Sequence, residues 1–593
     1  MPSRPSAFAS RVLSRGAAVA RSPLGRVLAA TLVLRVVGIL WGLPASDGWD
    51  NDGIAPRDFL AGLVETITPG HYFTYPPAHL AILAALTAPI TAVALVRAHS
   101  LAPADVVTEI LAVPYMTAIA VVARLVSVAM SLGVSWNMAK TAEELRGPRA
   151  AWCVAAILGV NAPLTYYAHT TNLDVPYLFW GSLALLWLVR AVARGEPKLL
   201  RRWAVFAAIA VATKDQAYAL FLLAVPLAVV AWALLLFSQD GAVRARLLVR
   251  ETAIAAGLCL ALVVVLDGVL FNPTGFVARV RFLLGPASQD YAQYTSDWLG
   301  RGFVVRDLLS RLDHFVPWVL SAFALVGLPL ALRGREAGRV LAGALPLLVG
   351  VSFLVTFNCV ARRTDERFGM PEATMLALYS GIGVDAVVSS LRPPALRWVA
   401  RVSAAASLAW GLFLAAAVDV NLLYDPRYAA EDWLREHVRP GDTVETYGLN
   451  VYMPRFPHGL RVVRVGPAAE DHRNPMPGVE EVVDAYDTAR ARGARYIVVS
   501  EGWVWRYLLV SRDFPTDGRV LAPTQRRKAD DARATTYFRE LLESRYSPYR
   551  FVYASGFDSK VWPRVDLHAS TGRSIWIYER SGGGAPPNHE TGG

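Results

Sequence analysis

Three carboxylates gather in a short polar segment that follows the first long apolar stretch of the chain. Residues 47–53 read DGWDNDG, so Asp47, Asp50 and Asp52 are close neighbours. Asp, Asn and Gly are common turn residues, and a solvated turn is one interpretation. The other is catalytic, because a carboxylate held close to a hydroxyl group can remove its proton as a general base.

A second polar segment, HTTNLD at residues 169–174, is a short link between two apolar stretches. Asp174 stands where the next stretch begins, and an Asp at that position can accept hydrogen bonds from the first free N–H groups of a helix. The same carboxylate can also serve a functional site. One residue can do both, so both roles stay open.

A third polar segment, residues 358–368, carries Arg362, Arg363 and Arg367. Guanidinium groups bind phosphate oxygens in pairs, so the segment is a candidate phosphate site. The alternative is that Asp365 and Glu366 neutralise these arginines.

Lys214 adds a fourth cation, between Thr213 and Asp215 at the end of an apolar stretch. An ionisable side chain at that depth indicates a functional site, and the alternative is simple pairing with Asp215.

Long apolar blocks must position these polar segments. The chain has 593 residues, of which 54% are hydrophobic and 18% charged, whereas soluble domains carry about 25% charged residues. The blocks have the length of membrane-spanning helices and lack the alternation of barrel strands. The net charge of +11 comes mostly from Arg beside apolar blocks, which is typical of membrane topology rather than of nucleic-acid binding. The three cysteines show no spacing typical of disulfides or zinc sites.

About eleven spans are predicted, and the first is a retained span rather than a cleaved signal peptide. The predicted spans are 24–43, 118–139, 150–168, 175–193, 203–219, 220–237, 252–271, 314–332, 340–357, 370–388 and 398–418. Pro76–Val96 is assigned to a helix along the interface, because prolines open and interrupt it. With that assignment, the basic loops all share the side of the N-terminus, which the positive-inside rule places in the cytoplasm.

The composition changes near residue 419, where a small α/β domain is expected. We predict helices over 429–438 and 480–492 and strands over 443–447 and 495–500. The expected organisation is a cytoplasmic segment over 1–23, a membrane domain over 24–418, an extracytoplasmic α/β domain over 419–581 and a disordered tail over 582–593.

Residues 24–390 resemble, in order, the membrane glycosyltransferases of the GT-C fold that use lipid-phosphate sugars. The resemblance includes in particular the branch with protein O-mannosyltransferases and the aminoarabinose transferase of lipid A (glycosyltransferase family 39). The matching residues are Asp50-Asn51-Asp52 in the first outer loop, Tyr75-Pro76-Pro77 before the interfacial helix, Arg124-Leu125-Val126-Ser127 in span two, Asp174 after span three, Thr213-Lys214 in span five and Arg367-Phe368-Gly369-Met370-Pro371 before a late span.

The resemblance implies an inverting transfer of a sugar from a polyprenyl-phosphate donor to an acceptor hydroxyl at the outer face. Such enzymes usually show an Asp-Glu pair where this chain has Asp-Asn-Asp. Asp52 is the preferred base and Asp50 the next, because Gly53 allows a tight turn after Asp52. The residues expected to bind the donor phosphate or the substrate are Tyr75, Asn172, Asp174, Lys214, Arg362, Arg363 and Arg367.

The expected partners are the lipid-linked donor, a glycan, lipid or protein acceptor and the bilayer, with no nucleic acid and no cofactor. No metal site is expected, since His71 and His169 are isolated. The expected location is the plasma (inner) membrane. Two alternatives stay open: a transporter or flippase for a lipid-linked sugar, and a non-catalytic assembly factor of the same fold.

Overall fold

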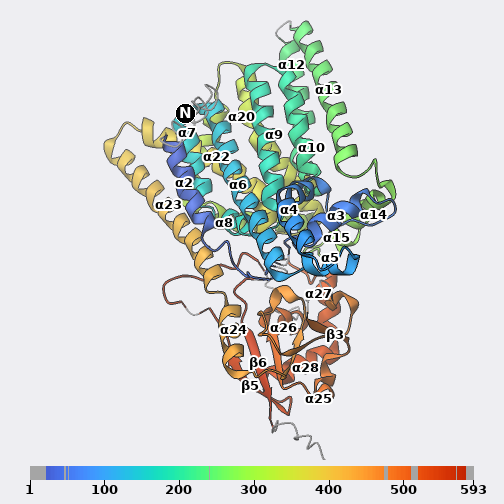
Figure 1. The fold of residues 1–593 in the computed structure, drawn as a ribbon. Coiled ribbons are helices and arrows are strands. Elements are labelled where there is room, and N and C mark those ends of the chain that lie inside the picture. Colours follow the sequence, from blue (N-terminus) through green and yellow to red (C-terminus); the bar gives the residue numbers. More distant parts are fainter. Residues whose placement is uncertain are drawn as a thin grey trace, which may run out of the picture.

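The computed structural model describes residues 22–45, 48–50, 52–238, 241–472, 478–508, 518–557, 559–568 and 571–581. Asp47, Asn51, most of the expected N-terminal segment and the expected C-terminal tail lie outside these ranges. The protein consists of a helical bundle and an α/β part beyond one end of it (Figure 1). The multi-span helical class with a C-terminal α/β part, expected from the sequence, is confirmed.

The bundle is formed by the following helices, given in chain order. They are α2 (Pro23–Val36), α6 (Val113–Arg146), α7 (Pro148–Gly159), α8 (Ala162–Ala168), α9 (Asp174–Arg194), α10 (Leu200–Val211), α11 (Tyr218–Phe221), α12 (Ala224–Phe237), α13 (Ala242–Leu266), α18 (Trp318–Ala322), α19 (Ala324–Ala331), α20 (Ala337–Phe353), α21 (Cys359–Ala361), α22 (Glu366–Ser390) and α23 (Pro394–Leu423).

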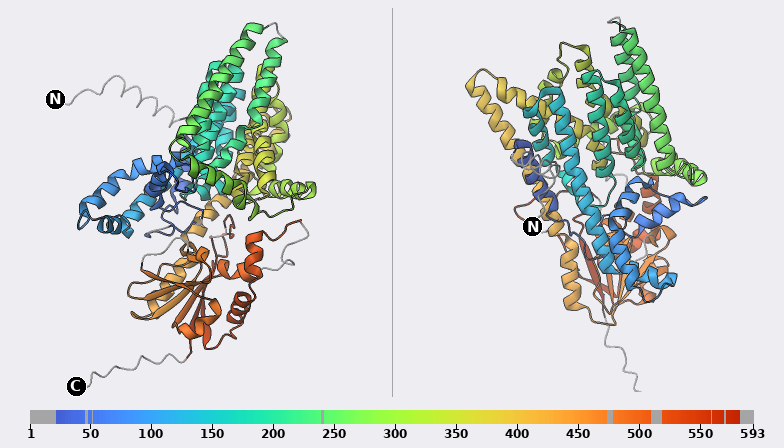
Figure 2. Two further views of the ribbon diagram at one scale, coloured as in Figure 1. Left: turned by 90° about the vertical axis from the view of Figure 1, so that its right-hand side faces the viewer. Right: turned by 45° about the horizontal axis from the view of Figure 1, so that its top comes forward.

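Seven further helices lie at the end of the bundle that faces the α/β part. They are α3 (Asp58–Ile67), α4 (Pro77–Arg97), α5 (Pro103–Ile110), α14 (Pro273–Leu284), α15 (Pro286–Gln289), α16 (Trp298–Ser310) and α17 (Leu312–Phe315). The left view of Figure 2 shows the blue helices α3 to α5 projecting sideways from the bundle.

Eight helices in the described ranges are long and apolar enough to cross a membrane, or up to ten if each of two bent pairs is one span. The sequence predicted about eleven. Two predicted spans fail by length, because α2 has 14 residues and α10 has 12, against about 20 for a full crossing. Conversely α4, which we assigned to the interface, is one of the eight. Its interfacial position stays a prediction.

Two pairs of consecutive helices are sharply bent at the break between them. The helices α7 and α8 meet at 68°, and those over 298–315 and 318–331 meet at 109°. Asn161 begins α8, since its side-chain oxygen accepts the Leu164 N–H at 2.8 Å. The bend therefore sets the direction in which the link over residues 169–173 approaches α9.

The centre of the bundle is closely packed. Helix α9 lies against α6, α10 and α20, and most of its residues are buried. Gly381 of α22 allows the close approach of α7, because a Cβ there would lie 2.5 Å from a methyl carbon of Val154. Small residues at helix contacts are typical of membrane bundles.

The C-terminal part is built on one mixed sheet. The strand order is β3-β2-β1-β4-β6-β5. The first four strands in that order are parallel to one another, and β6 runs antiparallel to both of its neighbours, β4 and β5. The strands are β1 (Thr443–Tyr447), β2 (Arg461–Gly466), β3 (Val479–Val483), β4 (Tyr496–Ser500), β5 (Tyr549–Ala554) and β6 (Ile575–Arg580). The helices are α24 (Pro426–His437), α25 (Ala489–Arg492), α26 (Glu501–Leu508), α27 (Pro523–Ala529) and α28 (Ala532–Leu542).

Three of the four elements that we predicted here are present, as α24, β1 and β4. The predicted helix over 480–492 is wrong in its first part, where β3 runs parallel to β2 with Val482 beside Val465. Valine favours strands. Pairing with β2 at the edge of the sheet therefore stabilises a strand here more than the helix-forming residues that follow stabilise a helix. Only α25 and the short turn before it are helical.

The α/β part is attached to the first polar segment (residues 47–53) through a buried ion pair. Asp425 lies between α23 and α24 and accepts hydrogen bonds from the Arg427 guanidinium and from Trp41 Nε1 at 3.1 Å. The same guanidinium lies 4.2 Å from the ring centre of Trp49. The loop that carries Asp50 and Asp52 is thus held from the C-terminal side.

Candidate active site

An ion pair joins the first polar segment to the third. Arg367 Nη1 lies 2.6 Å from Asp52 Oδ2. Arg367 is the second residue of α22, which follows Asp365 at the helix start, and its guanidinium lies over the Phe368 ring. The start of α22 therefore directs this cation toward the first polar segment.

A histidine from the C-terminal part reaches the same carboxylate. His568 Nε2 lies 2.8 Å from Asp52 Oδ2, and His568 Nδ1 lies 4.0 Å from Asp50 Oδ1. The ring stacks on Tyr166 of α8, with ring centres 6.0 Å apart. His568 comes only a few residues before β6, so the sheet and the bundle both determine its place.

Asp50 is the more enclosed of the two carboxylates. Its side chain is 4% exposed, whereas that of Asp52 is 28% exposed. Asp50 Oδ1 accepts the Asp52 N–H at 3.2 Å, and Oδ2 has no hydrogen-bond partner in the described ranges. A Cβ at Gly53 would lie 2.7 Å from Thr171 Oγ1 and 3.0 Å from Asp50 Oδ2, so this close turn requires glycine.

Beside Asp50 a cavity of about 30 Å³ extends toward Arg124 of α6. Arg124 is buried, and its Nη1 donates hydrogen bonds to the carbonyl oxygens of Ile39 and Trp41 at 2.6 and 2.8 Å. This arginine, part of the family-like stretch in span two, therefore fixes the chain as it leaves α2.

A second ion pair joins the second polar segment to Lys214. Lys214 Nζ lies 2.6 Å from Asp174 Oδ1, which also accepts a hydrogen bond from Gln216 Nε2 at 3.1 Å. The Asp174 N–H donates to Asn172 Oδ1 at 2.9 Å. Asp174 Oδ2 and Asn172 Nδ2 are buried and lack a hydrogen-bond partner among the residues described. Lys214 therefore pairs with Asp174 rather than with Asp215, which lies 3.2 Å from Arg279.

The pairs lie close enough for their charges to interact. Burial raises the pKa of Asp52, but Arg367 and His568 together lower it below its ordinary value, with a further contribution from Lys214. Burial raises the pKa of Asp50, and His568 only partly offsets this. Burial raises the pKa of Tyr75 well above its usual range, and the Asp52 charge acts in the same direction. The first polar segment, Tyr75 and the two cations Arg367 and Lys214 thus share one electrostatic environment.

Arg362 and Arg363 have other contacts. Arg362 has a left-handed backbone (φ 55°) and donates hydrogen bonds to Tyr294 O at 3.0 Å and to Gln289 Oε1. Arg363 Nη2 lies 3.0 Å from Asp365 Oδ2, and its guanidinium lies over Tyr291 and Phe368. Their expected role in binding phosphate stays a prediction.

Two residues of the site were not found from the sequence. His568 gave no signal, because it lies 516 residues from Asp52. Glu372 of α22 lies about 1.4 helical turns beyond Arg367 and could have been found as a carboxyl inside an apolar span. Its Oε1 accepts a hydrogen bond from Asn358 Nδ2 at 2.8 Å, and its Oε2 has no hydrogen-bond partner in the part of the chain that is described.

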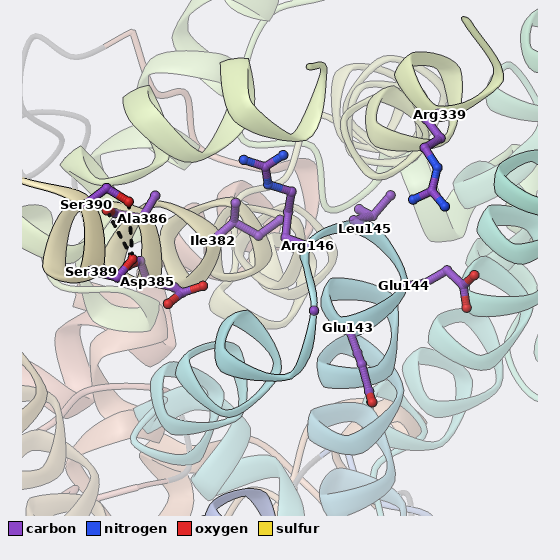
Figure 3. A pocket seen from close by; sticks show the side chains of 11 residues that line it. Glu143, Glu144, Leu145, Arg146, Arg339, Ile382, Asp385, Ala386, Ser389 and Ser390 are labelled. Carbon is purple, nitrogen blue, oxygen red and sulfur yellow. Dashed lines mark hydrogen bonds between the residues drawn. The ribbon is translucent and has the colours of Figure 1, made fainter. Parts of the chain in front are cut away.

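A larger hollow lies at the other end of α22. It has a volume of about 410 Å³ and is lined by charged residues such as Arg146, Arg339 and Asp385 (Figure 3). Helix α22 has 25 residues, which separates its ends by about 35 Å. The hollow is therefore distinct from the site around Asp52. In the described ranges no group of three or more His, Cys, Asp or Glu side chains could hold a metal ion.

No protein-family model matches the chain, and no curated protein matches it. Solved structures do. ArnT from Cupriavidus metallidurans, in the apo state and bound to undecaprenyl phosphate, is 15% identical, with a TM-score of 0.48 over 93% of this chain and 97% of that chain. The oligosaccharyltransferase AglB from Archaeoglobus fulgidus, in complex with an inhibitory peptide and a dolichol-phosphate, is 12% identical, with a TM-score of 0.43 over 93% and 88%. Each of these two proteins is similar in structure to this chain over about 93% of its length.

Proposed function

We propose that this protein is an integral-membrane glycosyltransferase. It moves a sugar from a polyprenyl-phosphate donor to an acceptor hydroxyl at the outer membrane face, with inversion at the anomeric carbon. The observation that carries the proposal is that two carboxylate–cation pairs, Asp52 with Arg367 and Asp174 with Lys214, share one site at the end of the bundle that faces the α/β part.

The chemistry needs two kinds of group, and both are present. The acceptor oxygen forms a bond to the anomeric carbon while its proton passes to a carboxylate. The bond from the anomeric carbon to the phosphate oxygen breaks, and its electron pair stays on the lipid phosphate. Cations near that phosphate stabilise the charge that develops there.

Asp52 is proposed as the base, because the acceptor can reach it. Its side chain is 28% exposed, against 4% for Asp50. The lowered pKa of Asp52 keeps the carboxylate ionised at neutral pH, although it also makes the carboxylate a weaker base. Asp50 has the raised pKa and is the alternative base, with access through the neighbouring cavity.

Lys214 and Arg367 are proposed to hold the donor phosphate. An ammonium group has three protons to donate and a guanidinium group has five. Asp174 takes one bond from Lys214, and Arg367 Nε has no hydrogen-bond partner among the described residues. Both cations can therefore bind phosphate oxygens without leaving their carboxylates.

The contact of His568 with Asp52 joins the site to the C-terminal part, which lies beyond one end of the bundle (Figure 1). The distribution of basic residues in the loops favours a position of that end outside the cytoplasm. We therefore propose a protein of the plasma (inner) membrane with a cytoplasmic N-terminus, whose donor lipid lies in the outer leaflet.

The test uses the full chain in lipid nanodiscs. A panel of radiolabelled undecaprenyl-phosphate sugars is supplied together with a membrane extract as the source of acceptors, and release of undecaprenyl phosphate is measured. We expect release with at least one sugar, and its loss in Asp52→Asn. If the protein only moved lipid-linked sugars between the leaflets of proteoliposomes and released no undecaprenyl phosphate, the transporter alternative would replace this proposal. If neither activity appeared with any sugar, a non-catalytic role would replace it.

A further inference from the structure

The C-terminal part contributes one side chain to the proposed active site. The His568 ring stands beside both carboxylates, 2.8 Å from Asp52 Oδ2 through Nε2 and 4.0 Å from Asp50 Oδ1 through Nδ1. Its side chain is 9% exposed, and one face of the ring stacks on Tyr166. These contacts fix the position of the ring in the site.

A short segment, which we call the strap (residues 559–568), carries His568 to this place. Trp562 of the strap stacks on Phe413 of α23, with ring centres 5.0 Å apart. Asn421 of α23 donates a hydrogen bond to the Pro563 carbonyl oxygen at 3.0 Å. Leu567 is buried in the core of the bundle. Since β6 begins soon after the strap, His568 is held both by the bundle and by the C-terminal sheet.

The charges around His568 favour its protonated form. Burial lowers its pKa, but the hydrogen bond to Asp52 and the charges of Asp52 and Asp50 outweigh burial and the opposing charge of Arg367, and they raise the pKa above its ordinary value. In return, His568 lowers the pKa of both carboxyls. Two neighbouring carboxylates resist being ionised together, and a cation next to both reduces that resistance.

Among the described residues, both cations bind the same oxygen of Asp52, which leaves Oδ1 for the substrate. Arg367 Nη1 and His568 Nε2 both bind Oδ2 of this carboxylate. A carboxylate fixed through one oxygen presents the other in a defined direction, and such orientation is a large part of catalysis.

We propose that His568 is a positioning residue that the C-terminal domain lends to the active site, where it holds Asp52 through Oδ2 so that Oδ1 faces the acceptor hydroxyl. The proposal rests on the proposed sugar transfer and deepens it. Its consequence is that the membrane domain alone has an incomplete site, which the strap completes.

The first test measures turnover with the undecaprenyl-phosphate sugar that the wild type uses. In His568→Ala we expect kcat to fall about tenfold to hundredfold, with the KM for the donor unchanged, because His568 contacts the base and not the cations. His568→Gln keeps a donor group and should retain more activity. His458→Gln, an exposed histidine of the same domain, is the matched control.

The pH profile separates positioning from a structural role. Without the cationic ring the two carboxyls bind protons more tightly, so the acid limb of kcat/KM moves to higher pH in His568→Gln. A merely structural role lowers the yield of folded protein and leaves the limb in place. An unchanged kcat in His568→Ala, or an increase that marks the strap as a plug, would overturn the proposal.

The second test is independent of turnover. A group whose pKa is raised on folding contributes stability that is present below its ordinary pKa, about 6.5 for His, and is lost as the pH rises through the raised value. The difference in thermal stability between wild type and His568→Gln should therefore shrink at alkaline pH, and it should be clearly smaller in an Asp52→Asn background, where the charge of Asp50 and the stacking on Tyr166 remain. A difference that depends on neither pH nor Asp52 would refute the contact. If the difference behaves as expected but no sugar is released, the contact stands and the transfer, with the role of His568 in it, is overturned.

Discussion

Arg367 Nη1 and Asp52 Oδ2 lie 2.6 Å apart, although Arg367 stands near the start of α22, late in the bundle, and Asp52 belongs to the first polar segment. This pair joins the proposed base to a proposed phosphate ligand. It also fixes how closely an acceptor hydroxyl and a donor phosphate approach each other, because each would bind one member of the pair.

The first prediction concerns Arg367. Loss of a charge-assisted hydrogen bond to a phosphate costs about 1.5–3 kcal/mol, which is roughly a tenfold to hundredfold drop in kcat/KM for the donor. We expect that drop in Arg367→Ala and a smaller one in Arg367→Lys, which keeps the charge and loses the planar fork. Donor kinetics and detergent-purified yield are measured for each variant.

The comparison variant is Arg363→Ala. Arg363 pairs with Asp365 and lies over Tyr291 and Phe368, so this change should lower stability. A loss of donor affinity in Arg363→Ala as well would support its predicted role in binding phosphate. If Arg367→Ala lowers thermal stability while the surviving protein keeps normal donor kinetics, Arg367 is structural.

The second prediction concerns the base. Asp52→Asn is nearly isosteric but cannot take the acceptor proton, so transfer should fall by about 10²–10⁴-fold while the protein stays folded. Asp50→Asn is the parallel variant. Loss of activity in Asp50→Asn with retention in Asp52→Asn would transfer the role to Asp50, and retention in both would contradict base catalysis by this loop.

The third prediction concerns Lys214 and Asp174. Asp174 is fully buried, and removing the cation of a buried pair costs about 3–5 kcal/mol, because a charge is left without compensation. Lys214→Met should therefore lower the thermal stability markedly. In Lys214→Met/Asp174→Asn both charges of this pair are absent, so much of the lost thermal stability should return.

The same double variant tests function. If Lys214 binds the donor phosphate, Lys214→Met/Asp174→Asn stays inactive although it is stable. If activity returned together with stability, the pair would be purely structural.

The main polar residues of the site were predictable because of the residue types and their places along the chain. Asp52, Asp174, Lys214 and Arg367 are charged residues at the ends of apolar stretches, where folding and topology do not require them. The partners within the site were not predictable. From the sequence, Asp215 was the alternative partner of Lys214. The structure pairs Lys214 with Asp174 instead, because the link before α9 lies close to the loop after α10.

Neighbouring arginines diverge for a local reason. Arg362 has a left-handed backbone, after which the chain turns before α22 begins. Arg362 consequently contacts Gln289 and Tyr294, whereas Arg367, inside the helix, contacts Asp52. Sequence spacing alone could not separate these two cations. The contact of the strap with Asp52 could not be predicted for a different reason. A single histidine in an irregular segment belongs to no periodic pattern that would indicate its place in the fold.

The last prediction concerns topology, which the distribution of arginines places with the C-terminal domain outside. The three natural cysteines, Cys153, Cys259 and Cys359, are buried or partly buried and are first changed to serine. A single cysteine is then placed at His458, an exposed position of the C-terminal domain. In intact cells it should react with a membrane-impermeant maleimide. Arg392→Cys, in a loop that we expect in the cytoplasm, should react only after the membrane is opened. The reverse pattern would invert the protein in the membrane and place the Asp52 site on the cytoplasmic face, where donors and acceptors of a different kind would have to be sought.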